Sequence, residues 1–194
     1  LVKKMKLKKV VVIGGGLVGA STAFFLSCFG AKVILLEMRN IASGASGRNG
    51  GMIMKIDGRD TDPEEIMKRL VYVQENDILL DRLCKLFSDD FGIVRRGSLD
   101  IATTPEEVEL LRGLVKMQKE EIGDEEIRFL DNKSLLKISP FLSKLCLAAR
   151  YRPSDGCLFP FRLVHTLCKA AEEKGADIRT WTPVEEVLIN NRRA

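Results

Sequence analysis

The chain has 194 residues, a length that suits one ordinary domain or one and a half. Hydrophobic residues make up 45% and charged residues 30%, which is the composition of a soluble globular protein with a sizeable core. The formal net charge of +4 is modest, and much of the excess precedes the first predicted strand, at Lys3, Lys4, Lys6, Lys8 and Lys9. This lysine cluster is short and has no aromatic residues between its members, so we expect no nucleic-acid partner.

The cysteines and the N-terminal region indicate a cytoplasmic protein. The five cysteines are odd in number and scattered, with no C-x-x-C pair, which favours free thiols in a reducing compartment over a disulfide framework. With a single histidine, His165, we expect no metal site. The apolar residues 10–26 after the lysines imitate a signal peptide, but glycines, Ser21 and Thr22 interrupt the run. We therefore predict no targeting or transmembrane segment.

A glycine motif follows the first apolar run. Residues 10–13 are all β-branched and predict a strand that is covered on both faces of a parallel sheet. Gly14, Gly16 and Gly19 then have the spacing G-x-G-x-x-G. In this motif the first glycine forms a tight turn, the second lets a pyrophosphate approach the backbone, and the third lets the helix pack on the strand. The N-terminus of that helix offers free N–H groups and a positive dipole end to phosphate.

The context that the motif requires comes next in the chain. Residues 20–29 predict an apolar helix that ends at Gly30, and residues 31–36 predict a second apolar strand. Glu37 closes this strand at nearly the distance of about 20 residues expected for the acid that binds a ribose hydroxyl. We predict a dinucleotide site in which Glu37 has that role. The alternative is a structural glycine turn with an ordinary acid at the strand end.

Residues 42–53 concentrate small residues, hydroxyls and one arginine beside this site. Glycine backbone N–H groups, Ser43 and Ser46 can donate hydrogen bonds to an anion, and Arg48 can pair with phosphate. On composition alone, a flexible surface loop is an equally good interpretation.

These three segments together resemble a known family. The strand–GGGLVG–helix unit, the ILLE strand end and the SGASGRNGGMI loop are similar to the N-terminal part of the FAD-dependent amine and amino-acid oxidoreductases. That family includes glycine oxidase, sarcosine oxidase, D-amino-acid oxidase and dehydrogenase, and dye-linked proline dehydrogenase subunits. A similar pattern returns in residues 151–160 and 175–178, so the resemblance spans most of the chain. Its specific part is residues 10–53.

The resemblance implies an α/β fold in which part of an α+β substrate domain is inserted into a Rossmann-like FAD-binding β-α-β domain. Residues 1–58 and 153–194 would form the FAD-binding domain, and residues 59–152 the partial substrate domain. The loop after Glu37 would wrap the FAD pyrophosphate and ribityl, with Met52 nearest the flavin ring. Val184 would hold the adenine by its backbone groups. The predicted cofactor-binding residues are Gly14, Gly16, Leu17, Val18, Gly19, Glu37, Met38, Ala45, Ser46, Arg48, Gly50, Gly51, Met52 and Val184.

The rest of the chain predicts mixed secondary structure and no catalytic residue. Thr61-Asp62-Pro63 and Thr104-Pro105 are helix starts, because a capping residue precedes proline and acids in each. The predicted helices are 62–88, 104–122, 131–140 and 162–174, and the predicted strands are 94–102, 145–151, 176–180 and 183–189. Residues 120–126 are predicted to be a solvated connection. Arg95, Arg96 and Arg150 are candidates to bind a substrate carboxylate, although surface arginines are commoner than ligands.

Our first interpretation is an FAD-dependent oxidoreductase that oxidises the C–N bond of an amino acid or secondary amine by hydride transfer to flavin. One alternative is a flavoenzyme that oxidises a 2-hydroxy acid or glycerol phosphate, and another is a non-catalytic dinucleotide-binding subunit. NAD binding is a further alternative, which the serine-rich loop disfavours.

Members of the resembling family are about twice as long, and Met5 is the first methionine here. We therefore expect an N-terminal half that is inactive alone. It would need a C-terminal half or a partner subunit, and it could be oligomeric.

Overall fold

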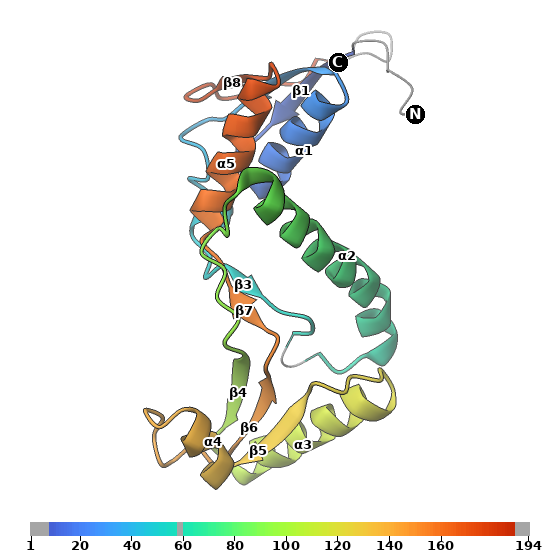
Figure 1. Cartoon of the computed structure of the whole chain (residues 1–194), viewed down its shortest axis with the longest axis vertical. Helices are drawn as coiled ribbons and strands as arrows, with labels where there is room; N and C mark the ends of the chain where they lie inside the picture. Colours follow the sequence, from blue (N-terminus) through green and yellow to red (C-terminus); the bar gives the residue numbers. More distant parts are fainter. Residues whose placement is uncertain (1–7, 58–59, 189–194) are drawn as a thin grey trace. The chain divides into compact units, whose positions relative to one another are not determined.

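The computed structural model describes residues 8–57 and 60–188 and divides the chain into two compact units (Figure 1). The first unit is Leu1–Gly51 with Phe159–Ala194, and the second is Met52–Leu158. The sequence predicted boundaries after residues 58 and 152. In the structure the compact units divide after Gly51 and Leu158, and β3 (Met52–Ile53) and β7 (Gly156–Cys157) pair with each other in the second unit.

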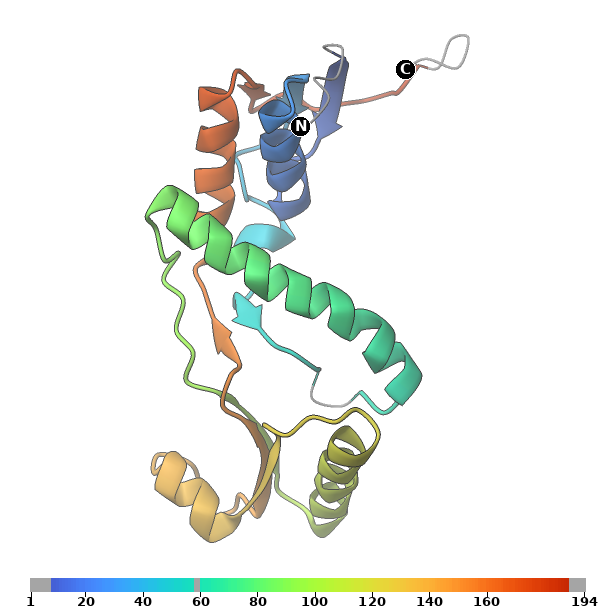
Figure 2. The same ribbon diagram turned by 45° about the vertical axis from the view of Figure 1, so that its right-hand side comes forward.

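The first unit has a Rossmann-like core. β1 (Lys9–Ile13), β2 (Lys32–Leu36) and β8 (Asp177–Arg179) form a parallel sheet in the order β1-β2-β8. α1 (Leu17–Cys28) connects β1 to β2, and α5 (Pro160–Glu173) precedes β8. Figures 1 and 2 show α1 and α5 side by side against the sheet. The predicted α/β class and the β-α-β unit are confirmed.

Only one face of this sheet is well covered by the described residues. Val12, Val33 and Leu35 alternate with more exposed neighbours and are buried against the helices. On the opposite face, Val11 and Ile13 are 56% and 58% exposed. The prediction that the first strand is covered on both faces is therefore wrong for the part of the chain that the structure describes. Its apolar residues leave a surface that further polypeptide could cover.

The predicted strand 183–189 does not form in the described residues, and its last position lies outside them. The segment after β8 is held instead by two backbone hydrogen bonds, from the Trp181 N–H to the Arg39 oxygen at 3.2 Å and from the Thr182 N–H to the Glu37 oxygen at 2.9 Å. Pro183 then has no N–H to continue this pairing. Val184 consequently lies in irregular, half-buried chain.

The second unit is built on an antiparallel sheet flanked by helices. β6 (Ala148–Arg152) is its central strand, paired with β4 (Ser98–Ala102) and β5 (Arg128–Asp131). The helices of this unit are α2 (Pro63–Phe87), α3 (Pro105–Glu120) and α4 (Asn132–Ile138).

The helix starts in this unit follow the predicted capping residues. The Asp62 carboxylate accepts the N–H groups of Glu64 and Glu65 at 3.0 and 3.2 Å. Thr104 and Glu107 form a reciprocal capping box, which satisfies two N–H groups that have no acceptor inside the helix. These predictions are confirmed.

β4 and β5 differ from the prediction. β5 was missed, because its four residues directly follow an acidic stretch that was interpreted as a connection. β4 begins at Ser98 and not at residue 94, because Gly97 has φ +88° and breaks the extended backbone. Val94 still makes an isolated bridge to Cys157.

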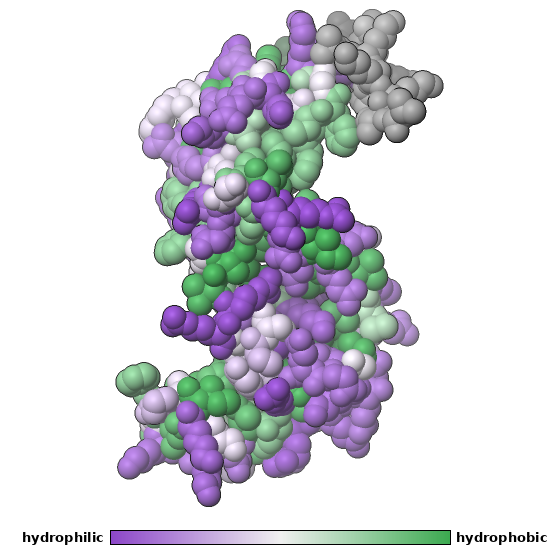
Figure 3. All heavy atoms as spheres, in the orientation of Figure 1, coloured by the Kyte–Doolittle hydropathy of each residue, from purple (hydrophilic) through white to green (hydrophobic). Residues whose placement is uncertain are grey.

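α2 is only partly buried. Ile66, Leu70, Leu80 and Leu83 are its buried residues, whereas apolar atoms reach the surface between charged ones along this helix (Figure 3). Nowhere in residues 8–57 and 60–188 is a helix both long enough and apolar enough to cross a bilayer.

A charged cluster lies inside the second unit. Arg150 and Arg152 point from β6 and are 1% and 0% exposed. Arg150 bonds the Asp100 carboxylate at 2.7 Å and the Gln118 side-chain oxygen at 3.2 Å. The structure therefore places Arg150 among internal partners and contradicts its candidacy as a substrate ligand. Arg152 pairs with the equally buried Asp124.

The partners of Asp124 decide its protonation. Burial alone would raise the pKa of this carboxyl, but the hydrogen bond and charge of Arg152, together with the charge of Lys55, bring the pKa below its ordinary value of 3.8. A carboxyl whose pKa is lower in the folded state stabilises the fold fully above pH 3.8. That contribution is lost as the pH falls through the folded-state pKa.

We predict that Asp124→Asn lowers the free energy of unfolding at pH 7, by on the order of 3 kcal/mol, because Arg152 is left buried without its main partner. The difference from wild type should shrink as the pH is lowered below 3.8 toward 3, since the carboxyl of the unfolded wild-type chain then takes up a proton and the wild type loses stability. Urea unfolding across this pH range measures both effects. A difference that stays constant from pH 7 to pH 3 would contradict the assignment.

Candidate functional site

The glycine turn between β1 and α1 needs two of its glycines for different reasons. Gly14 has φ +102°, a conformation that other residues rarely adopt, and its N–H donates to the Leu36 oxygen at 2.8 Å. At Gly19 a Cβ atom would lie 1.9 Å from the backbone oxygen of Gly14. The helix can therefore approach the turn only without a side chain at this position, as the motif predicts.

The carboxylate of Glu37 holds this turn against the end of β2. Its Oε2 accepts the Gly15 N–H at 2.7 Å and its Oε1 accepts the Arg39 N–H at 2.8 Å. Glu37 thus has a role in the fold whatever it binds. Each carboxylate oxygen has a second lone pair, so the group retains the capacity to accept ribose hydroxyls.

Gly15 must also be glycine, although it occupies an unspecified position of the G-x-G-x-x-G motif. A Cβ atom there would lie 2.6 Å from Ile41 Cδ1 and 3.1 Å from the side chain of Glu37. Any side chain would push Glu37 away from the turn. The signal in the sequence is the unbroken run of three glycines, of which the spacing rule uses only two.

Ser46 supplies the missing cap of α1. The N-cap residue, Gly16, has no side chain, and the Ser46 hydroxyl oxygen accepts the Leu17 N–H at 2.9 Å. The following first-turn N–H groups, of Val18 and Gly19, have no acceptor inside the helix. They are therefore available, with the positive end of the helix dipole, to an anion.

The loop that brings Ser46 here is organised by Asn49. Its side-chain nitrogen donates to the oxygens of Ala45 and Ser46 at 2.9 and 3.0 Å, and its side-chain oxygen accepts the Gly51 N–H at 2.7 Å. Asn49 is not among the residues predicted from the sequence. The Asn-Gly pair was the available signal, because asparagine side chains commonly bond nearby backbone in turns.

The structure brings most of the predicted residues together in the first unit. The three motif glycines, Glu37 and Ser46 lie at one turn. Trp181 and Thr182, which come shortly before Val184 in the chain, bond the backbone of Arg39 and Glu37. Met52 is 65% exposed and belongs to the second unit. The remaining predicted residues are exposed or part-buried residues of the turn and loop: Leu17, Val18, Met38, Ala45, Arg48 and Gly50, with Gly51 buried at φ +64°.

This donor set fits a dinucleotide. A side chain at Gly16 would come within 2.9 Å of Ser46 Oγ, so the space above the helix end is open only because glycine is there. The first-turn N–H groups of α1 lie at this helix end, and the Glu37 carboxylate lies at the end of the neighbouring strand. These are the groups that bind a pyrophosphate and a ribose.

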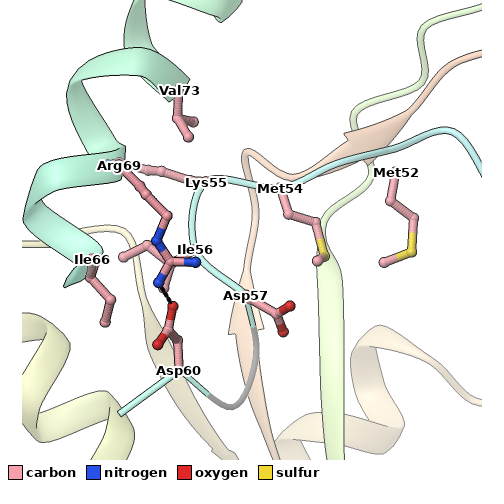
Figure 4. Close-up of a pocket in the computed structure, with 9 residues that line it drawn as sticks. All are labelled: Met52, Met54, Lys55, Ile56, Asp57, Asp60, Ile66, Arg69 and Val73. Atoms are coloured by element: carbon pink, nitrogen blue, oxygen red, sulfur yellow. Dashed lines mark hydrogen bonds and ion pairs between the residues drawn. The ribbon is translucent and has the colours of Figure 1, made fainter. Parts of the chain in front are cut away.

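The second unit contains a cavity of about 270 Å³ beside β3 and α2. Figure 4 shows Arg69 reaching from α2 to the Asp60 carboxylate, with which it forms an ion pair. Met52, Met54, Ile66 and Val73 provide apolar walls, and Lys55 contributes a cation. The cavity can therefore hold a small molecule with apolar and charged parts.

Comparison with known proteins assigns the family. The sequence pattern of the FAD dependent oxidoreductase family (DAO) matches residues 9–194, so the chain belongs to this family. Its members use FAD, and the glycine turn described above has the form that this cofactor requires.

The similar proteins are amine and amino-acid enzymes for the most part. Glycine oxidase of Geobacillus kaustophilus is 29% identical over 179 residues, which are 92% of this chain and 47% of that protein. Rat (Rattus norvegicus) mitochondrial dimethylglycine dehydrogenase is 28% identical over 91% of this chain and 20% of its own. A glycerol 3-phosphate dehydrogenase of Caloramator mitchellensis is 27% identical, over 87% of this chain and 34% of its own.

A solved structure agrees with these relatives. Glycine oxidase from Bacillus cereus superposes with a TM-score of 0.80 at 27% identity, covering 96% of this chain and 50% of that one. The chain thus spans half or less of the length of the relatives that it matches.

We predict that Glu37→Ala acts on both stability and binding. Losing a charged acceptor costs about 1.5–3 kcal/mol for each hydrogen bond, so thermal unfolding without cofactor should occur at a lower temperature, and FAD affinity should fall at least tenfold. Glu173→Ala, an exposed glutamate of the same unit, is the control. Unchanged stability would contradict the structural role, and lowered stability with unchanged affinity would limit Glu37 to the fold.

Proposed function

We propose that the chain is the cofactor-binding part of an enzyme that oxidises the C–N bond of an amino acid or a secondary amine. The observation that carries this proposal is the glycine turn, closed by Glu37 and capped by Ser46, in a member of an FAD-dependent family. The relatives named glycine oxidase and dimethylglycine dehydrogenase support the substrate class.

The residues of this chain would bind and orient the cofactor. FAD, when bound, supplies the acceptor for a hydride from the carbon that bears the nitrogen. Leu17 and Val18 at the helix end would lie against the pyrophosphate, Glu37 would accept the ribose hydroxyls, and Val184 would hold the adenine. Met38, Ala45, Arg48, Gly50, Gly51 and Met52 complete the proposed contacts. No catalytic residue is assigned.

A second function has one specific observation in its favour. A relative named glycerol 3-phosphate dehydrogenase matches nearly the same part of this chain, so oxidation of an alcohol carbon is the alternative. A non-catalytic dinucleotide-binding subunit would have the same glycine turn. A panel of amino acids, sarcosine, 2-hydroxy acids and glycerol phosphate, applied to this chain together with its C-terminal half or partner subunit, distinguishes these functions.

We also propose a cytoplasmic location and a requirement for further polypeptide. All five cysteines are free, and Cys28 and Cys157 are exposed, which suits a reducing compartment. The relatives contain about as much chain again, which supports a C-terminal half or a partner subunit as the missing component.

We predict that Gly16→Val weakens nucleotide binding. Its side chain would occupy the space above the helix end and displace Ser46. Trp181 is the single tryptophan and its backbone bonds that of Arg39 beside the site, so its fluorescence should report the titration. ADP, which absorbs no visible light, should change the emission of wild type and bind Gly16→Val at least roughly tenfold more weakly.

Gly44→Val is the matched control. Gly44 lies at φ −88° in the loop that carries Ser46, and a Cβ atom there would meet nothing within 4 Å. It should keep wild-type affinity. Wild-type affinity in Gly16→Val would show that the nucleotide binds elsewhere.

We predict that the 194 residues alone bind FAD but do not oxidise a substrate. Catalysis requires the reacting carbon to be held close to the flavin in a site that excludes water, and the relatives devote twice this length to it. Anaerobic loss of the flavin colour with amino acids, sarcosine, 2-hydroxy acids and glycerol phosphate is the measurement. Rapid bleaching by this chain alone would contradict the prediction, and the substrate that bleaches would identify the function.

A further inference from the structure

One buried carboxylate in the second unit holds two segments that are far apart in the sequence. Asp155, in the turn between β6 and β7, is 1% exposed. Its Oδ2 accepts the Ser98 hydroxyl at 2.6 Å, and its Oδ1 accepts the backbone N–H of Lys55 at 3.0 Å. Arg152 Nε lies 3.9 Å from the same Oδ1. Both oxygens of the carboxylate therefore have specific partners.

The backbone around Asp155 is itself firmly placed. The Gly97 N–H donates to the Asp155 oxygen at 2.9 Å, which fixes the turn to the start of β4. At Gly156 a Cβ atom would lie 2.3 Å from the Val94 oxygen, so the two backbones are in close contact. Asp155 thus projects from a well-packed frame.

Lys55, in contrast, lies just beyond the end of a two-residue strand. The ladder between β3 and β7 pairs Met52 with Cys157 and Ile53 with Gly156. The next pair would involve Asp155, where β7 has already ended. The side chain of Asp155 takes over as acceptor and extends the hydrogen bonding of β3 to Lys55. A second link runs from Lys55 Nζ to Asp124 Oδ1 at 3.6 Å.

We infer that Asp155 is a positioning residue that fixes the segment from Met52 to Lys55. This inference rests on the proposed function for its catalytic meaning, because Met52 is the residue proposed to lie nearest the flavin ring. Met54 and Lys55 line the cavity of the same unit. Asp155 acts on cofactor and substrate only through these residues.

A buried ionic group need not exist for stability, since apolar residues of similar volume often serve as well. The Asp155 carboxylate instead fixes the positions of its partners, because each of its two oxygens accepts a hydrogen bond from one defined donor. The test must therefore report on Met52 and Lys55 directly and not only on unfolding.

The experiment uses the whole chain with ¹³C-methyl-labelled methionine and amide hydrogen exchange. In wild type, the Lys55 amide should exchange slowly although it lies outside a strand. Asp155→Asn should speed this exchange about tenfold, since an amide oxygen is a weaker acceptor than a carboxylate. The methyl resonances of Met52 and Met54 should move, while that of Met38 in the first unit should not.

Two control variants isolate the contact. Ser98→Ala removes the other partner of Asp155 and leaves the Lys55 bond. Asp177→Asn removes a surface charge in the first unit. Neither should change Lys55 exchange more than twofold. Fast exchange of Lys55 in wild type would overturn the inference without any variant, and so would Met52 and Met54 resonances that are identical in Asp155→Asn and wild type.

Adding FAD to the wild type separates the two proposals. A shift of the Met52 methyl resonance supports the proposed function. No shift at saturating FAD would contradict the flavin contact of Met52 and remove the catalytic meaning of the inference. The comparison of wild type with Asp155→Asn without FAD would still decide whether Asp155 holds the segment.

Discussion

The bond between the Glu37 carboxylate and the Gly15 N–H is the contact on which the first unit depends. It ties the turn after β1 to the end of β2, so the C-terminal ends of the two parallel strands and the N-terminus of α1 lie together. Gly15 must be glycine for the carboxylate to reach it, and Gly19 must be glycine for α1 to lie on the turn. Ser46 then reaches the N-terminus of α1 because the loop after Glu37 folds back. A single side chain thus organises both the fold and the candidate site, and it explains why affinity and stability should change together.

In the second unit, buried side chains determine the position of the segment from Met52 to Lys55. Met52 and Ile53 pair with β7 over only two residues, which is too short to define the chain that follows. Two contacts of Lys55 fix the chain that follows. The Asp155 carboxylate accepts its backbone N–H, and its Nζ pairs with Asp124, which is itself paired with Arg152. The carboxylates of Asp124 and Asp155 and the guanidinium of Arg152 are buried, whereas Lys55, which pairs with Asp124, also lines the cavity.

Local patterns predicted the local elements well. Capping residues such as Asp62 and Thr104 marked helix starts, because the interaction that forms a cap lies within a few residues of sequence. The glycine motif and Glu37 predicted the parallel β-α-β unit for the same reason. Contacts between distant residues were not accessible: the burial of Arg150 depends on Asp100 and Gln118, and the role of Asp155 depends on Lys55. The exposure of Val11 and Ile13 likewise depends on what covers the sheet, which no local pattern contains.

The measurement that tests the central claim most directly is an ADP titration followed by ¹H–¹⁵N NMR of the whole chain. If the Glu37-held turn binds the nucleotide, the amide resonances of Gly15, Leu17 and Val18 should shift in a saturable manner. Those of the second unit, such as Leu130 in β5, should stay in place. Saturable shifts confined to the second unit, or none in the glycine turn at millimolar ADP, would contradict the account.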